Sequence, residues 1–251
     1  MRADEDVGDA AIIVITAGAN QKPNETRLDL VQKNAKIMTD VVTQIKEQEY
    51  KGILLIVSNP VDIMTQVAME VSGFPEHRVF GSGTVLDSAR LRYHLGQHLG
   101  VDSRSVHAFV IGEHGDSEIA AWSSANVSGV PLNSFCEMRG HYNHEGNTES
   151  IEEQVKNSAY EIIAKKDATY YGIAMVVKRI CQAIVRDEKS IFPISLRMHG
   201  EYALEDVVLS MPAIVGARGI ETTIPISLDE KEVSRLHESA EMLRETRKEI
   251  R

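Results

Sequence analysis

The sequence predicts an α/β fold with a parallel sheet in its first half and an α+β unit with antiparallel strands in its second. Two continuous apolar runs, AIIVIT at residues 11–16 and ILLIV at residues 53–57, are typical of parallel strands that are buried on both faces. Between them, residues 28–49 repeat apolar side chains at helical spacing. After residue 190, strand-like segments follow one another over short connections, which favours antiparallel pairing.

The first 82 residues follow the order of a doubly wound sheet. After the second strand, the tripeptide SNP at residues 58–60 interrupts the pattern, and a second helix extends to about residue 72. Residues 78–82 then form a third strand. This β-α-β-α-β order predicts a parallel sheet with crossover helices. We therefore expect a first domain of residues 1–82 and a second domain of residues 83–251.

The second half is predicted to contain helices followed by short strands. Residues 106–111 (VHAFVI) have the composition of one short buried strand, and residues 150–186 form a helical region interrupted around 167–172. A last helix begins at about Asp229, with acidic side chains in its first turn and its apolar residues on one face. The other predicted strands are 191–198, 207–210, 214–215 and 222–226, and the apolar face of the last helix comprises Val233, Leu236, Ala240 and Leu243.

The composition argues against several classes of function. A formal net charge of −10 over 251 residues opposes non-specific nucleic-acid binding and docking on anionic membranes. No apolar run approaches the roughly 18 residues of a membrane span, and the acidic N-terminus lacks the residue order of a signal peptide. Cys136 and Cys181 are isolated, with neither a CxxC motif nor a disulfide framework. These features predict a cytoplasmic protein without nucleic-acid or membrane partners.

Two pairs of histidines have spacings that occur in metal sites, but neither pair predicts one. His94 and His98 lie one helical turn apart, yet no carboxylate follows His94 as it does in zinc-protease helices. His141 and His144 fall in a polar segment with two glycines, which we interpret as a loop. We therefore expect no metal in this protein.

The motif GEHGD at residues 112–116 is the strongest indication of chemistry. It follows a predicted strand, and α/β enzymes usually place reactive groups at the carboxyl ends of strands. An imidazole has an ordinary pKa of about 6.5, so a neighbouring charge adjusts His114 for acid–base catalysis at neutral pH. The flanking glycines permit a tight turn and the close approach of a ligand. From the motif alone, either Glu113 or Asp116 could be the charged partner of His114.

Four polar clusters stand in order along the chain: residues 21–27 (QKPNETR), 58–62 (SNPVD), 87–90 (DSAR) and 112–116 (GEHGD). Together they resemble the lactate/malate dehydrogenase family, and its L-lactate branch in particular, from about residue 9 to the C-terminus. The first 18 residues do not contain the strand–GxGxxG–helix that opens a dinucleotide fold. The resemblance therefore implies an incomplete Rossmann-type sheet, with about 65 residues of two βα units absent, followed by a substrate domain.

The resemblance implies NAD-dependent interconversion of L-lactate and pyruvate by hydride transfer. His114 would donate the proton to the carbonyl oxygen, and Asp87 would hold the other ring nitrogen and stabilise the imidazolium. Arg90 has the planar fork that binds a carboxylate through two hydrogen bonds. Arg27 follows the first strand in a polar loop that, in relatives, closes over the substrate and brings the arginine to the carbonyl.

The same comparison places further residues at the substrate and at the cofactor. Gln21 is neutral, which suits the methyl group of pyruvate, whereas a second carboxylate would be costly to enclose without a partner. Asn59 would contact both cofactor and substrate, and Thr169 would lie beside the substrate. The cofactor contacts that the resemblance implies are Gly18, Ala19, Val57, Asn59 and Ser82.

Arg92 and His107 match the positions that bind fructose 1,6-bisphosphate in allosteric bacterial relatives. Cationic side chains that gather at a subunit interface suit a phosphate. We therefore expect the sugar bisphosphate to raise substrate affinity by stabilising an active homotetramer. The strand at residues 11–16 would form an uncovered sheet edge, and without the glycine-rich phosphate loop we expect weak NADH binding and little turnover.

Other interpretations stay open at this point. A malate-type 2-hydroxy-acid dehydrogenase would use the same chemistry, and Gln21 argues against it. An inactive truncated remnant, or a subunit that only forms oligomers, would keep the interfaces of the family without its turnover. A simple carboxylate-binding module would need Arg90 alone.

Overall fold

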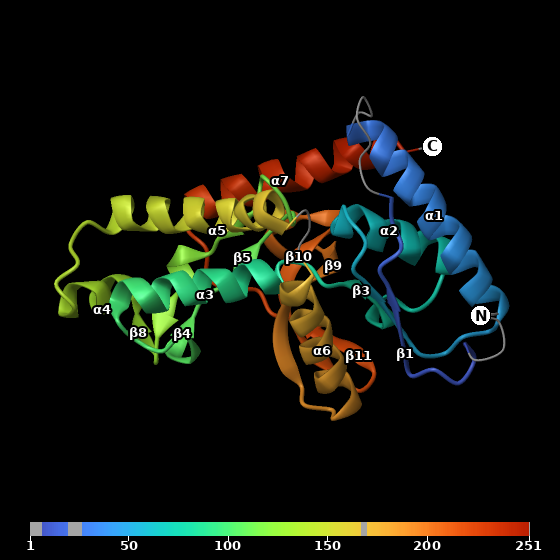
Figure 1. Cartoon of the computed structure of the whole chain (residues 1–251), viewed down its shortest axis with the longest axis horizontal. Helices are drawn as coiled ribbons and strands as arrows, with labels where there is room; N and C mark the ends of the chain where they lie inside the picture. Colours follow the sequence, from blue (N-terminus) through green and yellow to red (C-terminus); the bar gives the residue numbers. More distant parts are fainter. Residues whose placement is uncertain (1–6, 20–26, 167–169, 251) are drawn as a thin grey trace.

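A six-stranded sheet in the order β1-β2-β3-β9-β10-β11 forms the centre of the computed structural model, which describes residues 7–19, 27–166 and 170–250 (Figure 1). The first three strands pair in parallel and the last three pair antiparallel. Its strands are β1 (Ile12–Ile15), β2 (Ile53–Ile56), β3 (Val79–Gly81), β9 (Ser190–His199), β10 (Glu205–Gly216) and β11 (Gly219–Thr223). The α/β class with an antiparallel second part is thus confirmed.

The parallel and antiparallel halves meet in one continuous sheet. β3 and β9 pair antiparallel where Gly81 lies opposite Ser195. A Cβ atom at Gly81 would collide with Thr65 Oγ1 of helix α2 (Val61–Ser72) and with the side chain of Ser195. Glycine is therefore needed at this junction so that the helix can pack closely on the sheet.

Helices pack on the sheet above and below its antiparallel part in Figure 1, where α7 crosses over β10 and α6 lies beneath it. The amphipathic helix α1 packs on α2, which in turn contacts β3, β9 and β10. Most of the apolar core surrounds this sheet. The helices are α1 (Arg27–Glu47), α2 (Val61–Ser72), α3 (Val85–Leu99), α4 (Leu132–Met138), α5 (His144–Lys166), α6 (Tyr171–Val185) and α7 (Glu230–Lys248).

A smaller unit extends from the sheet, on the left of Figure 1, and consists of α3, α4, α5 and five short strands. It has its own apolar cluster, to which α3 contributes Leu91, Leu95 and Leu99. One small sheet contains β4 (Val106–His107), β7 (Asn126–Val127) and β8 (Val130–Pro131), and the other contains β5 (Val110–Ile111) and β6 (Ile119–Ala120).

The single strand predicted at residues 106–111 is wrong. β4 pairs with β7 and β5 pairs with β6, so the two halves of this run belong to different sheets. The cause is the packing of α3 against residue Val110, whose backbone N–H donates to Ser88 Oγ at 2.8 Å and whose carbonyl accepts from Thr84 Oγ1 at 2.5 Å. The side chains of Thr84 and Ser88, at the start of α3, thereby bind both backbone groups of Val110 where β5 begins.

The two strands predicted at 207–210 and 214–215 are one strand, β10. Pro212 suggested a break, but it lies opposite Pro193 of β9. A pair of prolines fits an antiparallel ladder where the two residues exchange no backbone hydrogen bond, so neither missing N–H leaves an acceptor without its donor. The last strand, β11, spans Gly219–Thr223 and so begins three residues before the predicted range of 222–226. Residues 224–229 are not in a strand.

The loop predicted around His141 and His144 is correct only for its first part. α5 begins at His144, six residues before the predicted start of the helical region. Asn143 precedes it, and its side-chain oxygen accepts from the backbone N–H of Gly146 at 3.3 Å, as an N-cap residue does. Asn143 is therefore a helix-start signal in the sequence, and the prediction of a loop overlooked it because of the neighbouring glycines Gly140 and Gly146.

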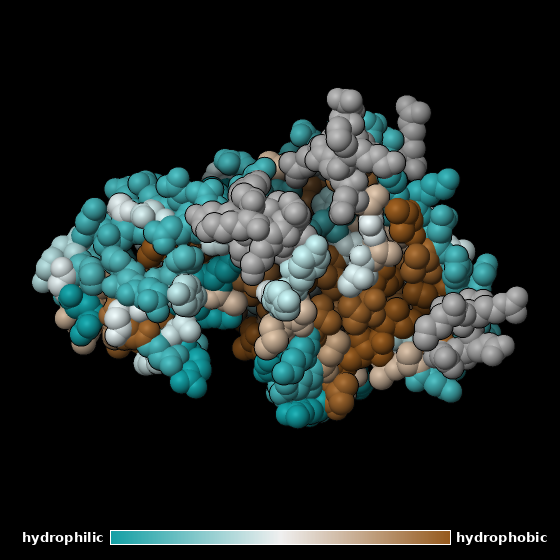
Figure 2. Space-filling model, in the orientation of Figure 1, coloured by the Kyte–Doolittle hydropathy of each residue, from teal (hydrophilic) through white to brown (hydrophobic). Residues whose placement is uncertain are grey.

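β1 lies at an edge of the six-stranded sheet, as expected for residues 11–16. Three of its four side chains are only half-buried, whereas all four of β2 are buried. α6 exposes Met175 and Val185 to solvent, and Figure 2 shows apolar surface over the sheet between α6 and β1. Among the described residues, no helix has the length and apolarity needed to cross a membrane.

We predict that Asp229→Ala lowers the free energy of unfolding by about 1 kcal/mol, because it removes the N-cap of α7. Asp229 Oδ1 accepts from Glu232 N at 2.8 Å, and Glu232 Oε2 accepts from Asp229 N at 2.9 Å, which completes a capping box. Urea unfolding followed by circular dichroism measures this difference. The neighbouring Glu230→Ala, at an exposed position, is the matched control, and an equal loss in both variants would contradict the prediction.

Candidate active site

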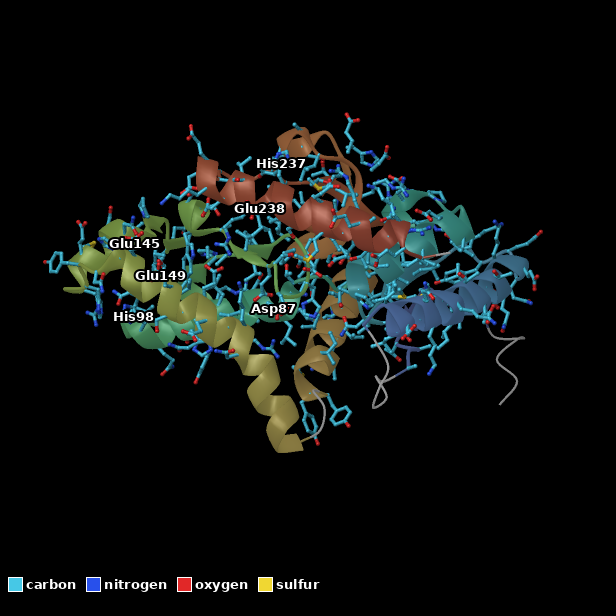
Figure 3. All side chains as sticks on the ribbon, turned by 90° about the horizontal axis from the view of Figure 1, so that it is seen from above. Asp87, His98, Glu145, Glu149, His237 and Glu238 are labelled. Carbon is cyan, nitrogen blue, oxygen red and sulfur yellow. The ribbon has the colours of Figure 1, made fainter. Side chains whose placement is uncertain are left out.

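His114 and Asp87 form a close polar pair at the boundary between the sheet and the smaller unit. His114 Nδ1 lies 2.7 Å from Asp87 Oδ2, and Asp87 Oδ1 accepts from Arg90 Nη1 at 3.0 Å. Asp87 is in the first turn of α3 and is buried, whereas the side chain of His114 is 30% exposed. Figure 3 shows Asp87 near the centre of the molecule. The carboxylate therefore orients the imidazole from the protein interior.

The other two carboxylates of the motif are placed differently. Glu113 is buried and its Oε2 accepts from Ser117 Oγ at 2.5 Å. Asp116 is exposed. Of the three acids that sequence reasoning considered as partners of His114, the structure brings Asp87 to the ring nitrogen.

Backbone contacts to two other elements hold the loop that carries His114. Gly112 exchanges two backbone hydrogen bonds with Ser210 of β10, at 2.9 and 2.8 Å, and Glu113 N donates to Ser239 Oγ of α7 at 2.8 Å. Gly112 has a φ of +84°, and a Cβ there would press against Ile119 and Ser239. Glycine is thus required for the turn that presents His114.

The charges around His114 favour its protonated form. Burial alone would lower the pKa of the imidazole, but the carboxylate of Asp87, with smaller contributions from Asp62 and Glu118, raises it to about 9. Burial opposes ionisation of Asp87, yet His114 and Arg90 together hold the pKa of that carboxyl below its usual value. At neutral pH the pair is thus an imidazolium next to a carboxylate, and the imidazolium of His114 can donate a proton.

Two further acidic side chains lie near this pair, and sequence reasoning assigned no role to either. Asp62, in the first turn of α2, is 1% exposed and its Oδ2 accepts from the backbone N–H of His114 at 2.8 Å. Burial raises the pKa of the Asp62 carboxyl to about 6. Glu118 is 5% exposed, and burial together with the charge of Asp87 raises the pKa of its carboxyl to about 8.

Asp87, His114 and Glu118 offer ligand atoms that all lie within 4.8 Å of one another. Nδ1 of His114 is already hydrogen-bonded to Asp87. A metal ion bound through this nitrogen would have to replace the bond that orients the imidazole, so the cluster fits proton transfer better than metal binding.

The residues expected at the cofactor gather at the carboxyl ends of the three parallel strands. Gly18 and Ala19 follow β1, Val57 and Asn59 follow β2, and Ser82 follows β3. Asn34 of α1 links two of these ends, because its Oδ1 accepts from Ala19 N at 2.7 Å and its Nδ2 donates to Asn59 O at 3.0 Å. Such a row of strand ends is where open parallel sheets bind nucleotides.

The residues expected at the substrate are only partly described. Arg90 is 15% exposed and lies one helical turn beyond Asp87, and Asn59 is exposed. Arg27 is the first residue of α1, but its side chain is outside the described part. Gln21 and Thr169 lie outside the described residues.

The two residues expected to bind a sugar bisphosphate lie on neighbouring elements. Arg92 is in α3 and half-buried, and its burial lowers the pKa of the guanidinium. His107 is exposed at the end of β4, which contacts α3.

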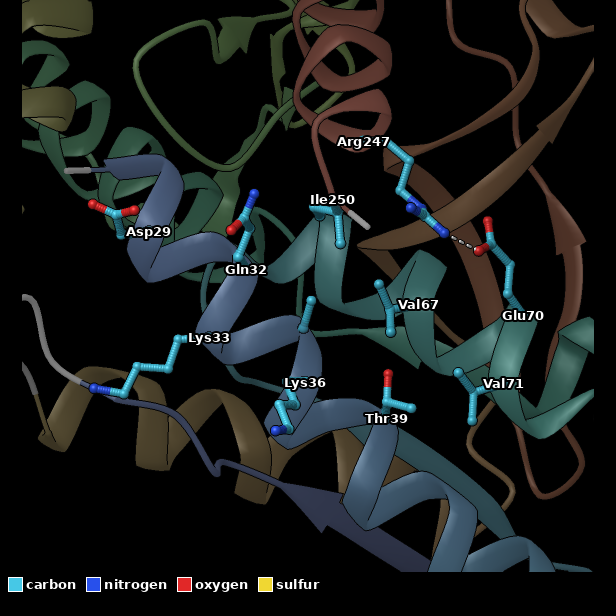
Figure 4. A pocket seen from close by; sticks show the side chains of 11 residues that line it. Asp29, Gln32, Lys33, Lys36, Thr39, Val67, Glu70, Val71, Arg247 and Ile250 are labelled. Carbon is cyan, nitrogen blue, oxygen red and sulfur yellow. Dashed lines mark hydrogen bonds and ion pairs between the residues drawn. The ribbon is translucent and has the colours of Figure 1, made fainter. Parts of the chain in front are cut away.

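A cleft of about 620 Å³ lies elsewhere, between α1, α2 and the end of α7 (Figure 4). Arg247 forms an ion pair with Glu70 at its wall, and Gln32 Nε2 donates to Glu249 O at 3.2 Å. None of the predicted active-site residues that the structure describes lines this cleft. Its contacts tie the end of the chain to α1 and α2.

Two family models match the chain. Residues 2–81 match the NAD binding domain of lactate/malate dehydrogenase, and residues 84–251 match the alpha/beta C-terminal domain of the same family.

Individual relatives agree with the family models. The L-lactate dehydrogenase of Acetivibrio thermocellus is 48% identical over 96% of this chain and 76% of its own length. That of Thermoanaerobacterium saccharolyticum is 47% identical over 98% of this chain and 79% of its own length. The chain therefore spans about three quarters of the length of these relatives.

Solved structures give the same result. The ligand-bound minor L-lactate dehydrogenase of Enterococcus mundtii superimposes with a TM-score of 0.94 at 42% identity, over 98% of this chain and 78% of its own. A lactate dehydrogenase from a Medee basin deep-sea metagenome has a TM-score of 0.94 at 45% identity, over 97% of this chain and 78% of its own. The fold, the polar site and both family models lead to one conclusion: this chain belongs to the lactate/malate dehydrogenase family.

Proposed function

We propose that this chain catalyses the NAD-dependent interconversion of L-lactate and pyruvate. The observation that carries the proposal is the His114–Asp87 pair, 2.7 Å apart, with Arg90 beside it and the row of strand ends nearby. Relatives that are 46–49% identical over nearly all of this chain are named L-lactate dehydrogenases, which supports the same reaction here.

His114 is the proton donor and acceptor in this proposal. Its Nδ1 faces Asp87, so the remaining ring nitrogen, Nε2, gives a proton to the carbonyl oxygen of pyruvate and takes it back from lactate. Asp87 stabilises the imidazolium before the transfer and keeps the ring in one orientation afterwards. The nicotinamide cofactor, when bound, would supply the hydride to pyruvate as NADH and accept it from lactate as NAD⁺.

Arg90 binds the carboxylate of the substrate. Its Nη1 is hydrogen-bonded to Asp87, and the guanidinium has further N–H groups in the same plane for a second acceptor. Asn59, Thr169 and Arg27 complete the substrate site in the proposal, with Arg27 polarising the carbonyl from the start of α1.

We assign residues 1–82 to the cofactor and residues 83–251 to the substrate. Gly18, Ala19, Val57, Asn59 and Ser82 would contact NAD. The groups at these strand ends suit a nucleotide, because backbone atoms and small side chains allow close approach and Asn34 holds two of the ends together.

Gln21 favours pyruvate over oxaloacetate, because a second carboxylate would lack a cationic partner there. Arg92 and His107 are the proposed site for fructose 1,6-bisphosphate, in a homotetramer. The feature that supports an anion is the half-buried guanidinium of Arg92 on α3, a helix that contacts the strand of the exposed His107.

We predict slow NADH oxidation by the purified chain with pyruvate, and slower oxidation with oxaloacetate. His114→Asn should reduce the pyruvate rate by about 10²- to 10⁴-fold, because it removes the acid–base group. Absorbance at high enzyme concentration measures these rates, with and without fructose 1,6-bisphosphate. Folded, soluble protein without any His114-dependent turnover would overturn the proposed function.

We predict that Arg90→Lys raises the KM for pyruvate by about 10- to 100-fold with a smaller change in kcat, since an ammonium cannot bind the carboxylate through two parallel hydrogen bonds. Arg104→Lys is the matched control, because Arg104 is 89% exposed and pairs only with Asp102 among the described residues. An unchanged KM in Arg90→Lys would show that this arginine does not bind the substrate.

A further inference from the structure

We propose that Asp62 is a positioning residue for His114, which holds the backbone of the histidine and places a second negative charge behind it. The inference rests on the proposed acid–base role of His114. Asp62 belongs to the segment SNPVD, of which Asn59 was expected at the cofactor, and nothing in the sequence links Asp62 to His114.

Asp62 joins three elements through its carboxylate. Oδ2 accepts from the backbone N–H of His114 at 2.8 Å, and Oδ1 accepts from Ser195 Oγ of β9 at 2.6 Å and from Ser210 Oγ of β10 at 3.4 Å. Both serines are fully buried, as is the carboxylate. The loop is therefore fixed to the sheet at the catalytic residue itself.

The sheet is built to admit this carboxylate. Gly81, Ser195, Ser210 and Gly112 follow one another across β3, β9, β10 and the His114 loop, each paired with the next. The row consists of small residues, and its glycine at residue 81 leaves room for α2. α2 can thus bring Asp62 down onto the two serines at the junction of the parallel and antiparallel halves.

An aspartate at this position differs from an asparagine in its acceptors and in its charge. Burying a carboxylate is costly, and here burial raises its pKa to about 6 even though three groups donate to it. An asparagine would fill the same space and accept the same N–H of His114, but its NH2 group could not accept from the two serine hydroxyls. The charge is kept despite the cost of burial, and among the described residues the titratable groups that face Asp62 are His114 and Glu113.

The charge of Asp62 acts on the imidazole together with that of Asp87. Asp87 approaches the ring at Nδ1, whereas Asp62 of α2 contacts the backbone N–H of the same residue. Both carboxylates, and Glu118, favour the protonated ring. An imidazolium flanked in this way keeps its proton until the substrate is in place.

Asp62→Asn tests the inference, because the amide keeps the shape and can donate to Ser195 Oγ while its oxygen still accepts from His114 N. We expect the pKa of the His114 imidazole to fall by about 1 unit in this variant. NMR titration of the chain with ¹³Cε1-labelled histidine measures it, and His114→Gln identifies the resonance. Asp116→Asn, an exposed acid in the same loop, is the control and should cause little shift, since solvent and salt screen its charge.

Ser195→Ala is the second variant and leaves the carboxylate in place. Removing the hydroxyl donor disfavours the ionised form of Asp62, so the pKa of His114 should fall again, by less than in Asp62→Asn. If Asp62→Asn does not fold, the His114 pKa measured in Ser195→Ala tests the inference instead. A His114 pKa that equals the wild-type value would overturn the inference, because a purely structural aspartate has no effect on the titration.

The titration reads His114 directly and needs no turnover. A lowered pKa without any reduction of pyruvate would support the role of Asp62 in positioning His114 and overturn only the proposed reaction. Pyruvate reduction by the wild-type chain, with no shift of the His114 pKa in the Asp62 variant, would support the proposed reaction and overturn the role of Asp62.

Discussion

The hydrogen bond between His114 and the buried carboxylate of Asp87 is the interaction on which the rest of the site depends. A buried charge is tolerated when it is paired and its hydrogen-bonding capacity is used, and Asp87 meets both conditions with His114 on one oxygen and Arg90 on the other. Because the pKa of the imidazole is raised to about 9 and that of the Asp87 carboxyl is lowered, the pair stabilises the fold fully between the ordinary carboxyl pKa of about 4 and about pH 6.5. This contribution is lost as the pH rises through about 9, and also in acid as Asp87 becomes protonated.

The continuity of the central sheet explains how this pair comes to lie beside the strand ends. β3 ends at Gly81, where it pairs with β9, and α3 starts four residues later with Asp87 in its first turn. β10, the neighbour of β9, pairs with Gly112 and so holds the loop of His114. The parallel strands that serve the proposed cofactor site and the loop that serves proton transfer are thus joined through two antiparallel strands.

Local patterns were sufficient for most of the fold. The apolar runs of β1 and β2, the helical spacing of α1 and the acids that open α7 each reflect contacts within a few residues, and each was predicted close to its observed position. The split of residues 106–111 was missed because it depends on Ser88 and Thr84, which lie 22 and 26 residues before Val110 at the start of α3.

The site itself was predictable only in part, for the same reason. The GEHGD motif identified His114, and Asp87 was selected by resemblance, since a partner 27 residues distant has no sequence signal of its own. Asp62 was missed because its partners lie 52, 133 and 148 residues away and meet it only where the two halves of the sheet join.

The protonation state of His114 is the most direct test of this account. A ¹⁵N NMR spectrum of the histidine rings, recorded on the wild-type chain at pH 8, distinguishes an imidazolium from a neutral ring. The arrangement of Asp87, Asp62 and Glu118 predicts that both ring nitrogens of His114 carry a proton at that pH, because its pKa is about 9. A neutral ring at pH 8, as in an ordinary imidazole with a pKa of about 6.5, would contradict it.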